Sequence, residues 1–127
     1  MTQEEKDLLL KDLSGRLPYG VIVKDTNINV TGTLSQIGLH YDMCTLDKDN
    51  GDSESCYILN CKPYLFPLES MSEEQSKIYH ELIGGMFGTS ALINFEVLED
   101  FFHKNHLDYR GLIPMGLAIA ATGKNIY

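Results

Sequence analysis

The stretch Asp47-Lys-Asp-Asn-Gly-Asp-Ser53 contains the strongest turn signal in the chain, and it decides the fold class. Asn50-Gly51 lies in its middle, and this dipeptide favours the tight turns that join antiparallel strands. Strand-like residues lie on both sides, ending at Met43 before the turn and covering residues 55–61 after it. We therefore predict a β-hairpin whose return strand is residues 55–61.

Apolar residues upstream of the hairpin alternate with polar ones, which is typical of strands with one buried face. The alternating residues are Ile28, Val30 and Leu34 before Gln36, and Ile37, Leu39, Tyr41 and Met43 after it. The pattern slips by one residue, and such a slip indicates a β-bulge or a break between two strands. A run of β-branched residues at 21–23 predicts a further strand before the alternating residues.

A helix is predicted before these strands. Thr2 and Glu5 have the spacing of a capping box, in which each side chain hydrogen-bonds to the backbone N–H of the other residue. Leu9 and Leu13 continue the apolar face of this helix, which we expect to end at Gly15. Residues 62–67 contain two prolines and are expected to be extended.

Two further helices are predicted after the strands. Ser72 and Gln75 form a second capping box, and the helix that follows is expected to end at Gly84-Gly85. Asn94 is expected to begin a third helix. The predicted buried faces contain Ile78, Tyr79, Leu82 and Ile83 in one helix, and Phe95, Leu98, Phe101 and Phe102 in the other. The apolar tail, residues 111–121, is predicted to be partly helical.

Tight loops join neighbouring strands in this pattern, so βαβ crossovers are not expected. We predict an α+β fold: an antiparallel meander or small partial barrel of four to five strands, with an N-terminal helix and two to three C-terminal helices. The 127 residues have the length of one domain, so residues 1–127 are expected to form a single domain.

The charge of the chain narrows the classes of partner. Its formal net charge is −8, and Arg16 and Arg110 are its only arginines, so a basic surface for nucleic acid is not expected. A protein partner or a homo-oligomer fits this composition better than nucleic acid does.

Three cysteines, Cys44, Cys56 and Cys61, have no CxxC spacing, and their number is odd. We expect free thiols that pack as small hydrophobes, with Cys44 and Cys56 facing each other across the hairpin. The polar, acidic N-terminus lacks the features of a signal peptide, and no apolar run approaches the roughly 20 residues of a membrane span. A cytoplasmic protein without membrane attachment is expected.

Two segments invite a metal interpretation. The acidic loop from Asp47 to Glu54 resembles a calcium loop, but an EF-hand beginning at Asp47 would need glycine at its sixth position and glutamate at its twelfth. His103, His106 and Asp108 have ligand chemistry, but histidines also favour a helix C-terminus by dipole interaction. We expect structural roles for both segments, and hence no metal and no cofactor.

His40, Asp42 and Cys44 would point to one face of a strand, as a thiol nucleophile with its base would require. No flanking sequence matches a known nucleophile signature. Polar decoration of an exposed sheet face is the simpler interpretation, and no catalytic residue is predicted.

Two segments place an arginine next to a tyrosine at the edge of a helix: Arg16 with Tyr19, and Arg110 with Tyr109. Arginine and tyrosine dominate the energetically important residues of protein interfaces. Together with Tyr64 and Phe66, these four residues are the candidate binding surface. The alternative is a structural role, with Arg110 paired to a helix carboxylate and Tyr19 packed under the sheet.

A resemblance to a family rests on three stretches. They are Lys11-Asp-Leu-Ser-Gly-Arg-Leu-Pro-Tyr-Gly-Val21, Lys62-Pro-Tyr-Leu-Phe-Pro-Leu-Glu-Ser-Met-Ser-Glu-Glu-Gln75, and Leu107-Asp-Tyr-Arg-Gly-Leu-Ile113 followed by Gly116-Leu-Ala118. The chain resembles a family of uncharacterised proteins of gut anaerobic bacteria and their phages or prophages. The resemblance implies an intracellular protein of mobile-element origin, and it implies no activity and no functional residues.

These features together predict a non-enzymatic intracellular binding or regulatory protein. One alternative is a small enzyme or ligand-binding domain that uses the face of His40, Asp42 and Cys44. Another is association with nucleic acid through exposed tyrosines, which the negative net charge opposes.

Overall fold

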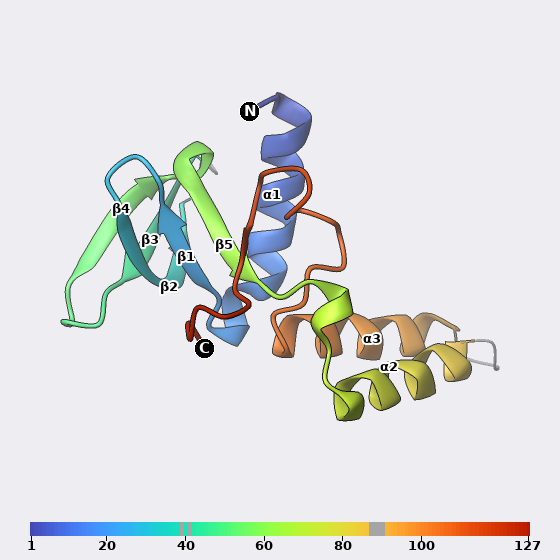
Figure 1. The fold of residues 1–127 in the computed structure, drawn as a ribbon. Coiled ribbons are helices and arrows are strands. Elements are labelled where there is room, and N and C mark those ends of the chain that lie inside the picture. The colour runs from blue at the N-terminus through green and yellow to red at the C-terminus, as the bar shows by residue number, and fades with distance from the viewer. Residues whose placement is uncertain (39, 41, 87–90) are drawn as a thin grey trace.

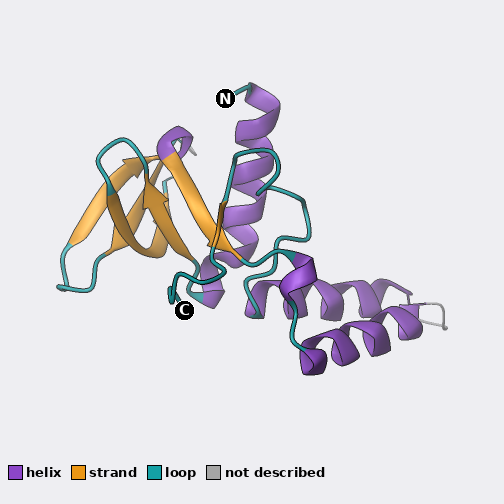
Figure 2. Ribbon diagram, in the orientation of Figure 1, coloured by secondary structure: helices purple, strands orange, loops and turns teal. Residues whose placement is uncertain are grey.

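A curved sheet, an N-terminal helix and a C-terminal pair of helices make up the α+β fold in the computed structural model, which describes residues 1–38, 40, 42–86 and 91–127 (Figure 1). The strands are β1 (Ile22–Asp25), β2 (Val30–Ile37), β3 (Met43–Asp47), β4 (Ser53–Tyr57), β5 (Cys61–Leu65) and β6 (Ile119–Ala120). Their order is β4-β3-β2-β1-β5-β6, and only β5 and β6 pair in parallel. Figure 2 shows the sheet bending around a core without closing.

The predicted hairpin is confirmed, but its return strand is shorter and begins earlier than expected. β3 ends at Asp47 and β4 begins at Ser53, with Gly51 at φ 89°, a left-handed conformation that favours glycine. The predicted strand over residues 55–61 is divided by a 3-10 turn, Ile58–Asn60, after which β5 begins. This turn carries the chain from β4, at one edge of the sheet, to β5, which pairs with β1.

The predicted slip in the apolar pattern is a β-bulge. The pairing of β2 with β3 shifts between Leu34 and Gln36, so one additional residue lies on β2. β2 ends at Ile37 and β3 begins at Met43, whose side chain is 36% exposed. Of the predicted second phase, Leu39 and Tyr41 lie outside the described residues.

Helix α1 (Gln3–Arg16) begins as predicted but ends one residue later. Thr2 and Glu5 exchange both hydrogen bonds of the capping box. Gly15 therefore lies inside the helix and does not end it. Its lack of a side chain leaves room for the ring of His103, which lies beside it. A Cβ atom at Gly15 would lie only 2.8 Å from His103 Cε1.

Helices α2 (Glu73–Met86) and α3 (Ala91–Lys104) form an antiparallel pair, which we call the helical arm. The capping box of Ser72 and Gln75 is confirmed by two hydrogen bonds. The predicted helix ends were wrong: α2 continues past Gly84-Gly85 to Met86, and α3 begins at Ala91, not at Asn94. The predicted helix in the tail is also wrong, because residues 111–121 form turns and the short strand β6.

The apolar side chains gather in two clusters. The first lies between α1 and the concave sheet, and it contains Leu9, Leu13, Val23, Leu34 and Leu46 among others. The second lies within the helical arm and beneath residues 66–71, and it contains Leu98, Phe101, Phe102 and Leu107. Among the helices of the described residues, none is long and apolar enough to span a bilayer.

Gly15→Ala tests the contact between α1 and α3. In an open helix this change is stabilising by roughly 0.5–1 kcal/mol. At Gly15 it forces a methyl group against the buried ring of His103, so we expect a lower free energy of unfolding. Gly84→Ala in α2 is the matched control, since nothing lies within 4 Å of its Cβ position, and it should be stabilising. Urea unfolding measures the free energy of unfolding of both variants. A higher value for Gly15→Ala than for the wild-type protein would show that His103 does not pack against Gly15.

Candidate functional site

The centre of the candidate site is an ion pair without exposed surface, between Asp12 and Arg16 of α1. Arg16 Nε lies 2.8 Å from Asp12 Oδ2, and the four-residue spacing places both side chains on one face of the helix. Arg16 Nη2 also donates a 2.6 Å hydrogen bond to the backbone carbonyl of Leu107. Because a buried charge is costly unless it is paired, this pair fixes α1 against the segment that follows α3.

Arg110 and Tyr109 complete the surroundings of the ion pair. Arg110 Nε donates to Asp12 Oδ1 at 3.2 Å, so two guanidinium groups share one carboxylate. The Cζ atoms of Arg16 and Arg110 lie 5.5 and 4.8 Å from the centroid of the Tyr109 ring, within the range of cation–π attraction. Tyr109 also stacks on Phe102 of α3, with ring centroids 4.7 Å apart.

His103 and Tyr19 extend these contacts along α3. His103 Nε2 lies 3.0 Å from the hydroxyl oxygen of Tyr109. The Tyr19 hydroxyl, at the end of the short 3-10 helix Leu17–Tyr19, donates to the carboxylate of Asp100. This hydrogen bond raises the pKa of Tyr19, and burial lowers the pKa of His103. Both shifts favour the neutral forms of these groups.

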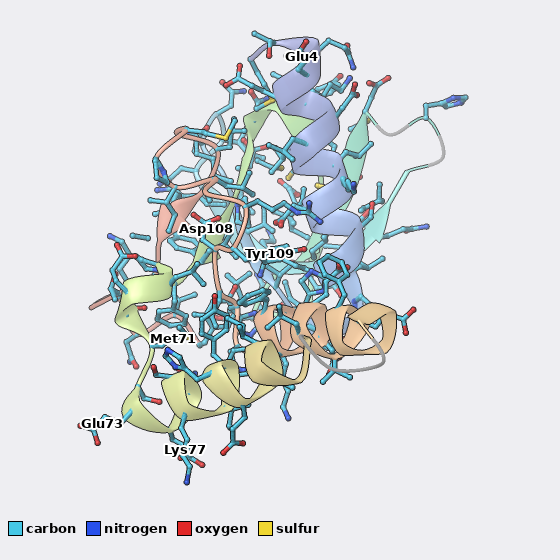
Figure 3. The ribbon with its side chains drawn as sticks, turned by 90° about the vertical axis from the view of Figure 1, so that its right-hand side faces the viewer. Glu4, Met71, Glu73, Lys77, Asp108 and Tyr109 are labelled. Carbon is cyan, nitrogen blue, oxygen red and sulfur yellow. The ribbon has the colours of Figure 1, made fainter. Side chains whose placement is uncertain are left out.

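We call this set the junction cluster; its members are Asp12, Arg16, Tyr19, His103, Tyr109 and Arg110. Figure 3 shows Tyr109 between α1 and α3. Four of the six residues predicted as a binding surface meet here. Arg16 is fully buried and Arg110 pairs with the carboxylate of Asp12 in α1, which favours the structural alternative for both arginines. Partner contact by Tyr19, Tyr109 and Arg110 stays a prediction.

The other two predicted residues, Tyr64 and Phe66, lie around the C-terminal residue. Tyr127 donates from its hydroxyl to the carbonyl of Tyr64, and its ring centroid is 5.9 Å from that of Phe66. His106 stacks on Tyr127 with centroids 3.7 Å apart. Tyr64 is 8% exposed, so it offers little surface to a partner.

The three residues of the predicted alternative enzyme site are not brought together. His40 and Asp42 precede β3 and are exposed, whereas Cys44 is buried within that strand. Asp42 forms an ion pair with Lys6, and their hydrogen bond lowers the pKa of Asp42. This arrangement gives the enzyme alternative no support.

Neither segment weighed for metal binding forms a ligand set. Both carboxylate oxygens of Asp108 accept backbone N–H groups, from Leu112 and Ile113, and His103 contacts Tyr109. In the hairpin loop, Asp47 accepts hydrogen bonds from two serine hydroxyls. Within the described part of the chain, the only group of three metal-ligating side chains lies elsewhere, in the sheet.

A groove between α2 and α3 is a feature that the sequence interpretation missed. It has a volume of about 490 Å³, and its apolar lining is two pairs of residues four apart: Ile78 with Leu82, and Val97 with Phe101. Ile78 and Val97 are 40% and 45% exposed. Ile78 and Phe95 belong to the predicted apolar faces of their helices, and both are exposed in the structure. Val97 is an apolar residue outside the predicted apolar face of its helix, and it was the sequence feature that could have indicated this groove.

The charged residues that line the groove are two carboxylates and one lysine: Glu74, Asp100 and Lys104. Over α2 and α3 together the sequence has six carboxylates and two lysines, a net charge of −4, which is half of the charge of the whole chain. Figure 3 shows Glu73 and Lys77 pointing away from the sheet.

Comparisons of the chain with protein-family models, with curated proteins and with solved structures find no match.

Asp12→Asn tests the ion pair. It leaves the Arg16 guanidinium buried without a counter-charge, so we expect a loss of about 3 kcal/mol or more in the free energy of unfolding. Asp7→Asn, on the exposed side of the same helix, should change it by less than about 0.5 kcal/mol. Equal effects of the two substitutions in urea unfolding would show that the pair contributes nothing specific.

His106 should make stability depend on pH. Burial, with a smaller contribution from Arg16, lowers its pKa to about 4. In the unfolded chain, the His106 ring takes up a proton near pH 6.5. The stability that the neutral ring contributes to the folded state is therefore fully present above about pH 6.5 and is lost as pH falls toward 4. We expect a loss on the order of 2 kcal/mol over that window. His106→Asn, which tolerates the observed φ of 55°, should flatten the slope. An unchanged slope would exclude His106 as its cause.

Proposed function

We propose that the chain is a non-enzymatic intracellular binding protein whose helical arm docks a basic, amphipathic helix of a protein partner. The observation that carries this proposal is the open groove between α2 and α3, lined by Ile78, Leu82, Val97 and Phe101. Apolar residues at this spacing on two adjacent helices offer the surface that a third helix occupies in helix-in-groove recognition. A catalytic role has no comparable support.

The charge of the helical arm supports a basic partner. Its net charge of −4 attracts Lys and Arg on the polar face of an incoming helix and accelerates encounter. The same charge opposes pairing of two copies through this face, because like charges across an interface are destabilising. A different protein is therefore favoured over a second copy.

The intracellular location and the mobile-element origin are parts of the same proposal. Cys44, Cys56 and Cys61 are buried and unpaired, as is typical of proteins in a reducing compartment. The resemblance of residues 11–21, 62–75, 107–113 and 116–118 to proteins of gut anaerobic bacteria and their phages or prophages supports the origin.

Titration with model peptides tests the docking site. One helical peptide carries leucines on one face and lysines on the other, and a second has the lysines replaced by glutamates. We expect the basic peptide to bind more tightly than about 1 mM and to shift the NMR signals of Ile78, Leu82, Val97 and Phe101. Failure to bind, or equal binding of the acidic peptide, would contradict the proposal.

Two substitutions on α3 separate the groove from general surface effects. Val97→Asp places a charge in the apolar lining and should weaken binding at least about tenfold. Phe95→Asp is the matched control, because Phe95 is 52% exposed on the same helix and does not line the groove. Sedimentation of the free protein adds a further test: a dimer that Val97→Asp dissociates would assign the groove to a second copy.

A further inference from the structure

The curved sheet brings four side chains with metal-ligand chemistry to one place in its core. Asp25 ends β1, Cys44 lies on β3, Cys56 on β4, and Cys61 begins β5. Asp25 is the register partner of Cys61, and Cys44 that of Cys56, so two neighbouring pairs from different strands converge. The predicted pairing of Cys44 with Cys56 across the hairpin is confirmed, whereas the approach of Asp25 and Cys61 to them depends on the bending of the sheet.

The distances among three of these four side chains fit a single ion, and the fourth lies beside them. A carboxylate oxygen of Asp25 and the Sγ atoms of Cys56 and Cys61 all lie within 4.8 Å of one another. Cys44 Sγ lies 3.6 Å from Cys61 Sγ. Two thiolates on one tetrahedral zinc ion, each about 2.3 Å from it, are separated by about 3.8 Å. The observed separation is close to that value and far from the roughly 2.0 Å of a disulfide.

The carboxylate of Asp25 is buried, and no positively charged side chain of the described residues compensates its charge. Asp25 is 2% exposed, and within the described residues no Lys, Arg or His forms an ion pair with it. Its Oδ1 accepts the backbone N–H groups of Asn27 and Ile28, which fixes its orientation. A buried carboxylate is costly without a compensating charge, and a metal ion supplies one.

We propose that Asp25, Cys56 and Cys61 form a zinc site, with Cys44 beside Cys61 as the nearest further thiol. Two thiolates and one carboxylate select a thiophilic divalent ion, and the burial of all three ligands favours a structural role. The site joins β4 to β1 and β5 across the side of the sheet where β4 and β5 are not paired. The metal would therefore connect the strands that hydrogen bonding leaves apart, and its binding energy would contribute to folding.

Metal binding to the whole chain tests the proposal. Protein purified under reducing conditions and freed of metal with a chelator is titrated with Zn²⁺ and with Co²⁺. We expect equimolar binding, a higher melting temperature with zinc, and a thiolate-to-cobalt charge-transfer band together with the intense visible bands of tetrahedral cobalt. Absence of binding, or cobalt bands of an octahedral oxygen site, would overturn it. So would a disulfide between Cys44 and Cys61 in the purified protein.

Substitutions assign the ligands. Cys56→Ser and Cys61→Ser should each abolish equimolar binding, and Asp25→Asn should weaken it while keeping an oxygen for the turn amides. Val23→Ala is the control for lost core packing, since Val23 is fully buried in the same sheet and carries no ligand. Val23→Ala should lower the stability of the protein without changing the stoichiometry of zinc binding. Equal loss of zinc in Val23→Ala, or undiminished binding in Cys56→Ser, would overturn the assignment.

Discussion

The carboxylate of Asp12 is the constraint on which the arrangement of this protein depends. It is fully buried in α1 and is shared by Arg16 and Arg110, which come from segments far apart in the sequence. Loss of this carboxylate would leave the Arg16 guanidinium, which has no exposed surface, without a counter-charge, which costs several kcal/mol. The segment after α3 must therefore follow α1 at this point, through the hydrogen bond from Arg16 to Leu107 and the stacking of Tyr109.

This constraint explains how a curved sheet carries an extended pair of helices. The sheet and the helical arm have separate apolar clusters, and the junction cluster lies between them. Among the described residues, the C-terminal part of α3 contacts α1 through His103 beside Gly15, and Asp100 contacts Tyr19 in the 3-10 helix that follows α1. The rest of the arm projects from the body, which leaves the groove between α2 and α3 uncovered (Figure 1). The proposed docking site is thus a consequence of where the arm is attached.

Local chemistry predicted the parts of this fold that depend on neighbouring residues. The capping boxes at Thr2 and Ser72, the hairpin at Asn50-Gly51 and the bulge near Gln36 each follow from hydrogen bonds or alternation within a few residues. The parallel strand β6 was not predictable, because it forms only against β5, more than fifty residues earlier. The junction cluster and the approach of Asp25 to the thiols were missed for the same reason: Arg16 and Arg110 were recognised as unusual, but their shared partner Asp12 was not.

Residual dipolar couplings measured by NMR test the central claim most directly, because they report whether the sheet and the helical arm keep one orientation. If the junction cluster fixes the arm, a single alignment tensor should fit the couplings of β1–β5 and of α2 and α3 together, and Asp12→Asn should require two tensors. If the wild-type protein already requires two tensors, the buried ion pair does not hold the arm in place and the account is contradicted.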